Sequence, residues 1–97
     1  MTESILRLYV AGTSATARRA EKQLVHIRAL IEPDWKVEVI DVLENPELAE
    51  KAGILATPTL CYERSHRSRR IVGDLSDAKR VLEFLGIEMM GSAHDHA

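Results

Sequence analysis

The feature that most constrains this chain is a strand, an amphipathic helix and a second strand that follow one another over residues 5–43. Residues 5–11 (ILRLYVA) are rich in β-branched and aromatic side chains and end at Gly12, as a buried strand does. Apolar residues then recur at helical spacing behind a Thr13 or Ser14 cap, which predicts a helix that runs to Ile31 and stops before Pro33. Residues 35–43 (WKVEVIDVL) predict the second strand. Strands joined in this way are expected to be parallel, with a right-handed crossover.

A short second helix is predicted over residues 46–52. Asn45 is expected to accept a hydrogen bond from a free backbone N–H, and Pro46 at the first helical position loses no hydrogen bond. Gly53 suits the left-handed residue that ends such a helix. This helix lies between the second strand and the rest of the chain.

The last part of the chain predicts a hairpin and a third helix. Residues 59–63 and 69–72 are expected to pair as strands joined by a five-residue polar loop. Ser76 is the predicted cap of a helix that Gly86 closes. Its predicted buried stripe consists of Ala78, Val81, Leu82 and Leu85.

The order β-α-β-α-β-β-α predicts an α/β fold of the thioredoxin-like class, a four-stranded sheet with helices on both faces. Residues 1–86 are expected to form one domain, and residues 87–97 (IEMMGSAHDHA) a frayed tail, because they show no sustained period. The interior is expected to be aliphatic, since apolar residues make up 45 % of the chain and aromatic residues only 4 %.

Charge and cysteine content narrow the function. The formal net charge of −2 gives no general attraction to nucleic acid or to an anionic membrane. Neither a leader nor a membrane-spanning segment is expected, and the single cysteine fits a reducing compartment, so the prediction is a cytoplasmic protein. The motifs indicate neither a metal site nor a cofactor.

Catalysis by a thiol is not expected. A thioredoxin oxidoreductase needs a thiolate of low pKa at the start of the first helix, where this chain has residues 12–16 (GTSAT). Cys61 falls instead in a predicted strand, which favours a buried, inert thiol. Pro58 occupies the place of the cis-proline loop in thioredoxin-like folds, and the sequence leaves the cis and trans forms equally open. The prediction is a binding protein and not an enzyme.

Four colinear segments resemble the KaiB family of circadian clock proteins: residues 8–12 (LYVAG), 39–50 (VIDVLENPELAE), 54–60 (ILATPTL) and 69–76 (RRIVGDLS). The resemblance implies a non-enzymatic regulator that binds the ring-shaped ATPase KaiC and modulates its phosphorylation cycle. It also implies KaiA or a SasA-like kinase as further partners where these exist. The family is known for two folds, a tetrameric resting form with a rewired C-terminal half and a thioredoxin-like monomer, so self-association as a tetramer or dimer and fold switching are implied as well.

Two departures from the family pattern concern the hairpin and the tail. Residues 64–68 (RSHRS) stand where cyanobacterial members commonly carry prolines, and the acidic tail is reduced to a few residues. Both departures suggest a homologue from outside the cyanobacteria, in a simpler timer or a stress response. They leave the balance of the two folds open.

The resemblance also implies which residues contact partners. The candidates for the surface that faces the ATPase are Glu47, Lys51, Gly53, Ala56, Thr57 and Pro58. Secondary candidates for partner or subunit contacts are Arg19, Lys22, Arg69, Arg70 and Asp74. Plain surface remains an equal alternative for each. Two other functions also stay open: a redox-related thioredoxin-like protein acting through Cys61, and a generic interaction module.

Overall fold

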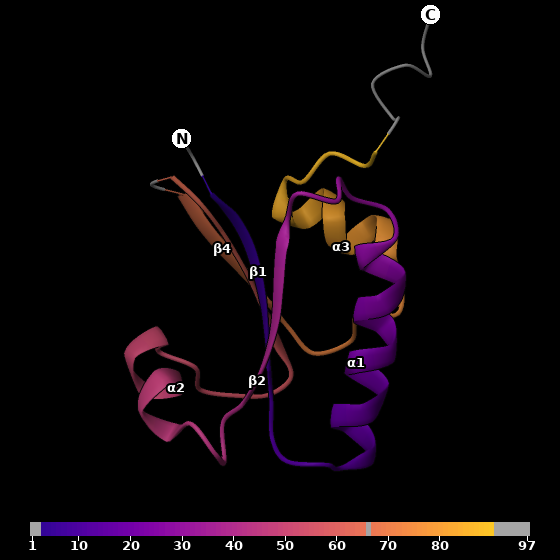
Figure 1. Ribbon diagram of the computed structural model, residues 1–97. Helices are drawn as coiled ribbons and strands as arrows, with labels where there is room; N and C mark the ends of the chain where they lie inside the picture. Colours follow the sequence, from indigo (N-terminus) through magenta and orange to yellow (C-terminus); the bar gives the residue numbers. More distant parts are fainter. Residues whose placement is uncertain (1–2, 66, 91–97) are drawn as a thin grey trace, which may run out of the picture.

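A four-stranded sheet carries two helices on one face and a short third helix on the other (Figure 1). The computed structural model describes residues 3–65 and 67–90. The elements follow the predicted order: β1 (Ser4–Val10), α1 (Ala15–Arg28), β2 (Lys36–Asp41), α2 (Pro46–Ala52), β3 (Thr59–Arg64), β4 (Arg67–Val72) and α3 (Ala78–Leu85). The mixed α/β architecture predicted from the sequence is therefore confirmed.

The strand order across the sheet is β2-β1-β3-β4. β1 pairs with β2 in parallel and with β3 antiparallel, so that Leu8 lies between Val39 and Leu60. β3 and β4 form an antiparallel hairpin. The predicted parallel pairing of the first two strands is confirmed, and β2 and β4 are the two edges of the sheet.

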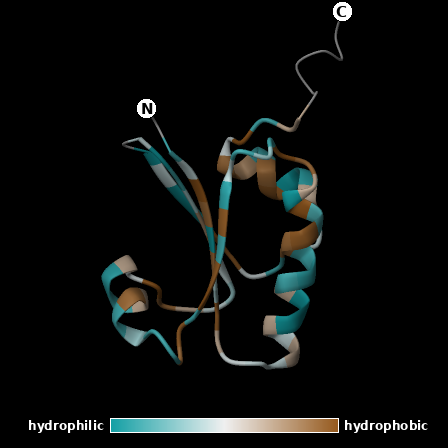
Figure 2. Ribbon diagram, in the orientation of Figure 1, coloured by the Kyte–Doolittle hydropathy of each residue, from teal (hydrophilic) through white to brown (hydrophobic). Residues whose placement is uncertain are grey.

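The hydrophobic core lies between the sheet and the pair α1 and α3. Alternate residues of β1 point to one face, and Leu6 and Leu8 on that face are completely buried. The predicted apolar stripe of α1 packs against them, and Figure 2 shows the apolar side of α1 turned toward the sheet. The buried residues of the three helices and their connections are Ala17, Ala20, Leu24, Ile27, Ile31, Ala49, Leu75, Val81, Leu82, Leu85 and Ile87.

Helix α1 is shorter than predicted, because it ends at Arg28 and not at Ile31. The N–H groups of Leu30 and Ile31 donate to carbonyls three residues back, those of Ile27 and Arg28, so the last turn is tighter than an α-helix. Ile31 is still 1 % exposed. Because Ile31 packs into the core, the helical spacing of apolar residues continues past the end of the helix. This spacing is why the sequence predicts a longer helix.

The helix caps agree with the sequence in part. Ser14 caps α1 by accepting from the N–H of Ala17, and Gly53 and Gly86 take left-handed conformations after α2 and α3. Asn45 is the N-cap of α2 as predicted, but its expected hydrogen bond is wrong, and so is the residue predicted to cap α3. The side chain of Asn45 accepts no hydrogen bond from α2 and donates instead to the carbonyl of Asp41, and the cap of α3 is Asp77 and not Ser76.

The predicted five-residue hairpin loop is also wrong. β3 continues to Arg64 and β4 begins at Arg67, and these two residues pair with each other. Residue 66 lies outside the described part of the chain. The strands extend further than predicted because exposed polar side chains on a hairpin hide the period-two signal of a strand.

The boundary predicted at residue 86 is too early. Ile87 is only 7 % exposed and belongs to the core, and the N–H of Met90 donates to the carbonyl of Leu30 over 2.7 Å. Ile87 and Met89 therefore pack against the core, Glu88 and Met90 are exposed, and the rest of the predicted tail, residues 91–97, lies outside the described residues. Within the described part of the chain, no helix has the length and apolar character needed to cross a bilayer.

Candidate functional site

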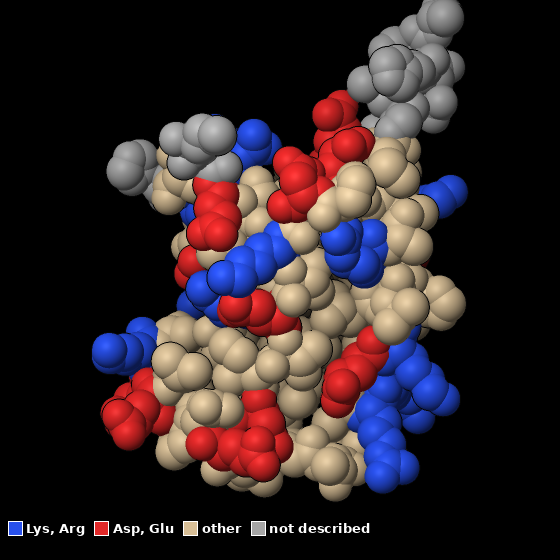
Figure 3. Space-filling model, viewed as in Figure 1, with Lys and Arg blue, Asp and Glu red and all other residues tan. Residues whose placement is uncertain are grey.

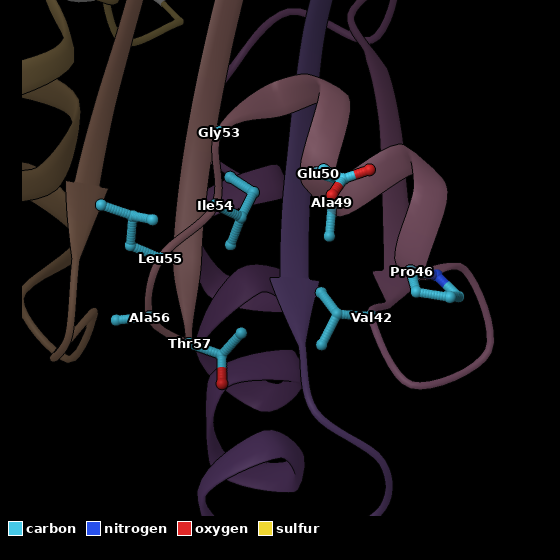
Figure 4. Close-up of a pocket in the computed structure, with 9 residues that line it drawn as sticks. All are labelled: Val42, Pro46, Ala49, Glu50, Gly53, Ile54, Leu55, Ala56 and Thr57. Carbon is cyan, nitrogen blue, oxygen red and sulfur yellow. The ribbon is translucent and has the colours of Figure 1, made fainter.

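An open apolar groove of about 510 Å³ lies between α2 and the segment that follows it (Figure 4). Val42, Ala49 and Ile54 point toward one another across it. Glu50 is the only charged residue in its lining. The lining, which we call the α2 groove, consists of Val42, Pro46, Ala49, Glu50, Gly53, Ile54, Leu55, Ala56 and Thr57.

Three exposed leucines lie on the same stretch of chain as the α2 groove: Leu55 in its lining, Leu43 next to Val42, and Leu48 on α2. The exposed fractions are 70 % for Leu43, 48 % for Leu48 and 99 % for Leu55. Single exposed apolar residues are common on protein surfaces, but several of them beside an apolar groove are typical of a contact site for another protein. The geometry therefore favours binding of a macromolecular surface over catalysis.

The C-terminal end of α2 is closed by a left-handed residue. Gly53 has φ +68° and ψ +35°, the N–H of Gly53 donates to the carbonyl of Glu50, and the N–H of Ile54 donates to that of Ala49. The chain therefore turns back along α2, which places residues 54–57 on the other side of the groove. The predicted conformation of Gly53 is thus what shapes the site.

The far end of this segment is fixed at Pro58. The Thr57–Pro58 peptide bond is cis, the alternative that the sequence left open. The hydroxyl of Thr59 donates to the carbonyl of Ala56 over 2.6 Å, and the N–H of Gly73 donates to the carbonyl of Pro58 over 2.9 Å. Loop 53–58 is therefore tied to β3 and to the end of β4.

A second cavity, of about 290 Å³, lies between α1 and the loop after β4, and Arg19, Pro58 and Asp74 all line it. Gln23 bridges its two sides, because its amide nitrogen approaches the Asp74 carboxylate at 3.4 Å and its amide oxygen accepts from the N–H of Leu75. Hydrogen bonds from Ser76 hold the pKa of Asp74 below its usual value, with a contribution from Gln23. Sequence reasoning missed Gln23, because no motif distinguishes it from other polar residues of α1.

The structure divides the predicted site residues into groups. Gly53, Ala56 and Thr57 line the α2 groove, and Glu47 and Lys51 are exposed on α2 itself. Arg19, Pro58 and Asp74 share the second cavity, whereas Lys22 is exposed on α1 and lines neither. The guanidinium groups of Arg69 and Arg70 donate to backbone carbonyls within the chain, Arg69 to Phe84 and Arg70 to Ala52 and Gly53.

Sequence reasoning missed the apolar part of the groove, above all Val42, Ile54 and Leu55. A signal was present, because residues 54–56 form an apolar run between two predicted elements. An apolar run outside the predicted helices and strands indicates either an exposed contact site or a buried loop.

The position at which thioredoxins carry their thiols holds no sulfur here. A small cavity of about 240 Å³ at the start of α1 is lined by hydroxyl and apolar residues, among them Ser14, Thr16 and Thr57. Cys61 lies elsewhere, in β3, where it is 8 % exposed and where burial raises the pKa of its thiol. A buried thiol with a raised pKa is a poor nucleophile.

Comparison with protein families decides the assignment. Residues 7–87 match the model of the KaiB domain. The chain belongs to the KaiB family. It is 47 % identical over 90 residues to the circadian clock oscillator protein KaiB of a Prochlorococcus marinus strain, with 89 % of this chain and 73 % of the relative covered. It is 48 % identical to the protein of the same name from a Synechococcus strain, with 89 % and 71 % covered. Membership in the KaiB family supports a role as a clock regulator and not as an enzyme.

Solved structures of low sequence identity share the fold. Thioredoxin O2 from Arabidopsis thaliana aligns with a TM-score of 0.69 at 22 % identity, covering 86 % of this chain and 75 % of that one. Chloroplastic thioredoxin z aligns with a TM-score of 0.71 at 23 % identity, covering 87 % and 76 %. The predicted thioredoxin-like fold is confirmed, and the resemblance to the KaiB family drawn from four short segments is confirmed as well.

Proposed function

We propose that this chain is a cytoplasmic clock or timer regulator that binds a KaiC-like ATPase and modulates its phosphorylation cycle. The contact is made by the docking surface, which we define as α2 together with residues 53–58. The observation that carries the proposal is the apolar α2 groove of about 510 Å³, with the fully exposed Leu55 in its lining, in a member of a family of clock proteins.

The docking surface suits a stable complex because its parts are held before the partner arrives. A left-handed glycine and several hydrogen bonds fix loop 53–58, so little chain entropy is lost on binding. Apolar side chains supply the contact area, and Leu55, at 99 % exposure, has the most surface to remove from water.

Further partners are proposed for the opposite side of the sheet. Basic side chains gather over the N-terminal half of α1 and acidic ones near α2 (Figure 3). Arg19 and Lys22, with Asp74 across the second cavity from Arg19, offer a polar surface for KaiA or a SasA-like kinase, where such partners exist. A resting tetramer or dimer, with the C-terminal half repacked, remains part of the proposal on the family resemblance alone.

The test is binding to the KaiC-like ATPase encoded in the same genome, measured by biolayer interferometry with and without ATP. Leu55→Asp is expected to weaken binding about tenfold or more, because it places a carboxylate in the apolar contact. The matched control is Val25→Asp, on the exposed side of α1 and 67 % exposed, which is expected to bind like the unchanged chain. Failure of the unchanged chain to bind the ATPase, or equal loss in both variants, would contradict the proposal.

Of the two alternatives, a generic interaction module and a redox function through Cys61, the second can be weighed against the structure. The burial of that thiol and its raised pKa argue against it. No observation favours a thiol reaction over partner binding at the docking surface.

A further inference from the structure

We infer that Arg70 is a positioning residue of the docking surface: its guanidinium, carried by β4, holds the C-terminal end of α2 in place beside residues 53–57. This inference rests on the proposed function of that surface. It assigns Arg70 a role within the chain in place of a direct contact with the partner.

The contact consists of two hydrogen bonds from one guanidinium. Nη2 of Arg70 donates to the carbonyl of Ala52 over 2.7 Å, and Nη1 donates to the carbonyl of Gly53 over 3.1 Å. The last carbonyls of a helix have no partner within the helix and carry the negative end of its dipole. A guanidinium group donates hydrogen bonds to both carbonyls and places a positive charge at the negative end of the dipole.

Helix α2 needs such a contact because little else holds it. It has seven residues, and Ala49 is the only one of them that is buried. A helix of this length is not stable in isolation, and most helices are held by burying an apolar face. In α2 most of the apolar face lines the open groove. Hydrogen bonds to the backbone groups at its ends therefore contribute more to holding the helix in place.

The alternation of β4 explains why Arg70 and not its neighbour performs this role. Arg70 pairs with Cys61 in the sheet and faces the side that carries α2. Arg69 pairs with Tyr62, a core residue of the opposite face, and its Nη1 donates to the carbonyl of Phe84 in α3 over 3.1 Å. Two successive arginines of one edge strand therefore attach to helices on opposite faces of the sheet.

Loss of the Arg70 contact should weaken binding without removing any contact to the partner. If α2 leaves its position for part of the time, only a fraction of the molecules can bind. The apparent affinity is then the intrinsic affinity multiplied by that fraction. The effect is then visible in the isolated chain as faster local opening of α2.

The first experiment uses the chain alone and compares Arg70→Met and Arg70→Lys with the unchanged protein. Amide hydrogen exchange of residues 49–57, read by NMR, is expected to be about five- to tenfold faster in Arg70→Met, with β1 and β3 unchanged. Arg70→Lys keeps the charge and one donor and is expected to be intermediate. The control Arg67→Met removes the same charge from the same strand, at an exposed position with no hydrogen bond to α2 among the described residues.

The outcomes separate the inference from the proposed function. Unchanged exchange over residues 49–57 in Arg70→Met, or faster exchange spread evenly over the sheet, would overturn the positioning role whatever the partner does. A binding assay with the KaiC-like ATPase follows, in which Arg70→Met is expected to bind about five- to tenfold more weakly and Arg70→Lys to recover part of the loss. Weaker protection of α2 with unchanged affinity would also overturn the inference. If the unchanged chain binds no such ATPase, the proposed function fails while the exchange result still stands.

Discussion

The carboxylate of Asp41 accepts a hydrogen bond from the backbone N–H of Gly12 over 2.9 Å, and the same oxygen accepts from the N–H of Leu43 over 3.0 Å. Asp41 is the last residue of β2, and Gly12 lies in the loop just after β1, which ends at Val10. The contact therefore joins the exit of β1 toward α1 to the turn that leads into α2. Gly12 has φ +63°, and a Cβ on it would lie 3.1 Å from Cδ1 of Leu43, so both conformation and space favour glycine.

Asp41→Ala is expected to lower the free energy of unfolding by about 1–3 kcal/mol, because two backbone N–H groups lose their acceptor. Asp41→Asn keeps an oxygen at the same place and is expected to lose less than half as much. Urea denaturation followed by circular dichroism measures both. Equal losses in the two variants would show that the acceptor oxygen is not what matters.

Ile87→Ala is expected to lower the free energy of unfolding by about 2–4 kcal/mol, because it leaves a cavity in the core beside α1 and α3. The exposed neighbour Glu88 provides the control, since Glu88→Ala should change stability by no more than about 0.5 kcal/mol. The two variants are compared by urea denaturation. If Ile87→Ala lowers the free energy of unfolding as little as the control does, Ile87 does not contribute to the core, and the frayed tail predicted from the sequence would be supported.

Much of the fold was readable from local patterns. The strand-helix-strand unit, the two left-handed glycines and the apolar stripes of α1 and α3 are set by short-range rules of spacing and backbone conformation. The errors fall where tertiary contacts override those rules. Ile87 follows a helix-ending glycine and belongs to no periodic segment, yet its side chain is buried in the core. Arg64 and Arg67 are polar enough to suggest a loop, but strand pairing extends to them.

The candidate site was readable only in outline. The short helix, Gly53 and Pro58 were all recognised, because each carries a distinct conformational signal. The groove itself depends on Val42 and Ile54, which come together only when the chain turns back along α2. Asp41, Gln23 and the hydrogen bonds of Arg70 link residues that are far apart in sequence, and isolated polar residues carry no pattern that could predict such partners.

A surface ion pair on the face of the sheet gives a pH-dependent prediction. Nε of Arg7 donates to Glu38 over 2.9 Å, and this hydrogen bond is the main reason that the pKa of Glu38 lies below its usual 4.5. Because the folded pKa is lowered, the stabilisation is fully present above about pH 4.5 and is lost as the pH falls through the folded value. Glu38→Gln should cost about 0.5 kcal/mol at pH 7, and its difference from the unchanged chain should shrink as the pH falls below about 4.5.

Urea midpoints at pH 7, 5 and 3 measure this difference. Glu44→Gln is the control, since Glu44 makes no ion pair among the described residues. Its stability relative to the unchanged chain should be nearly the same at all three values. A difference for Glu38→Gln that grows toward low pH would have the wrong sign and would refute the role of the ion pair.

The thiol of Cys61 is expected to be unreactive in the folded chain. It is 8 % exposed, and burial raises its pKa, so both access and the thiolate fraction are low at pH 8. Alkylation by iodoacetamide at that pH should be at least about tenfold slower in the native chain than in urea, as followed by mass spectrometry. Cys61→Ala removes the sulfur altogether, and we expect it to cost about 1 kcal/mol of stability while leaving binding to the KaiC-like ATPase unchanged. Rapid alkylation of the native chain, together with loss of biological activity in Cys61→Ala, would instead favour a redox function, because neither result follows from a buried strand residue that only fills space.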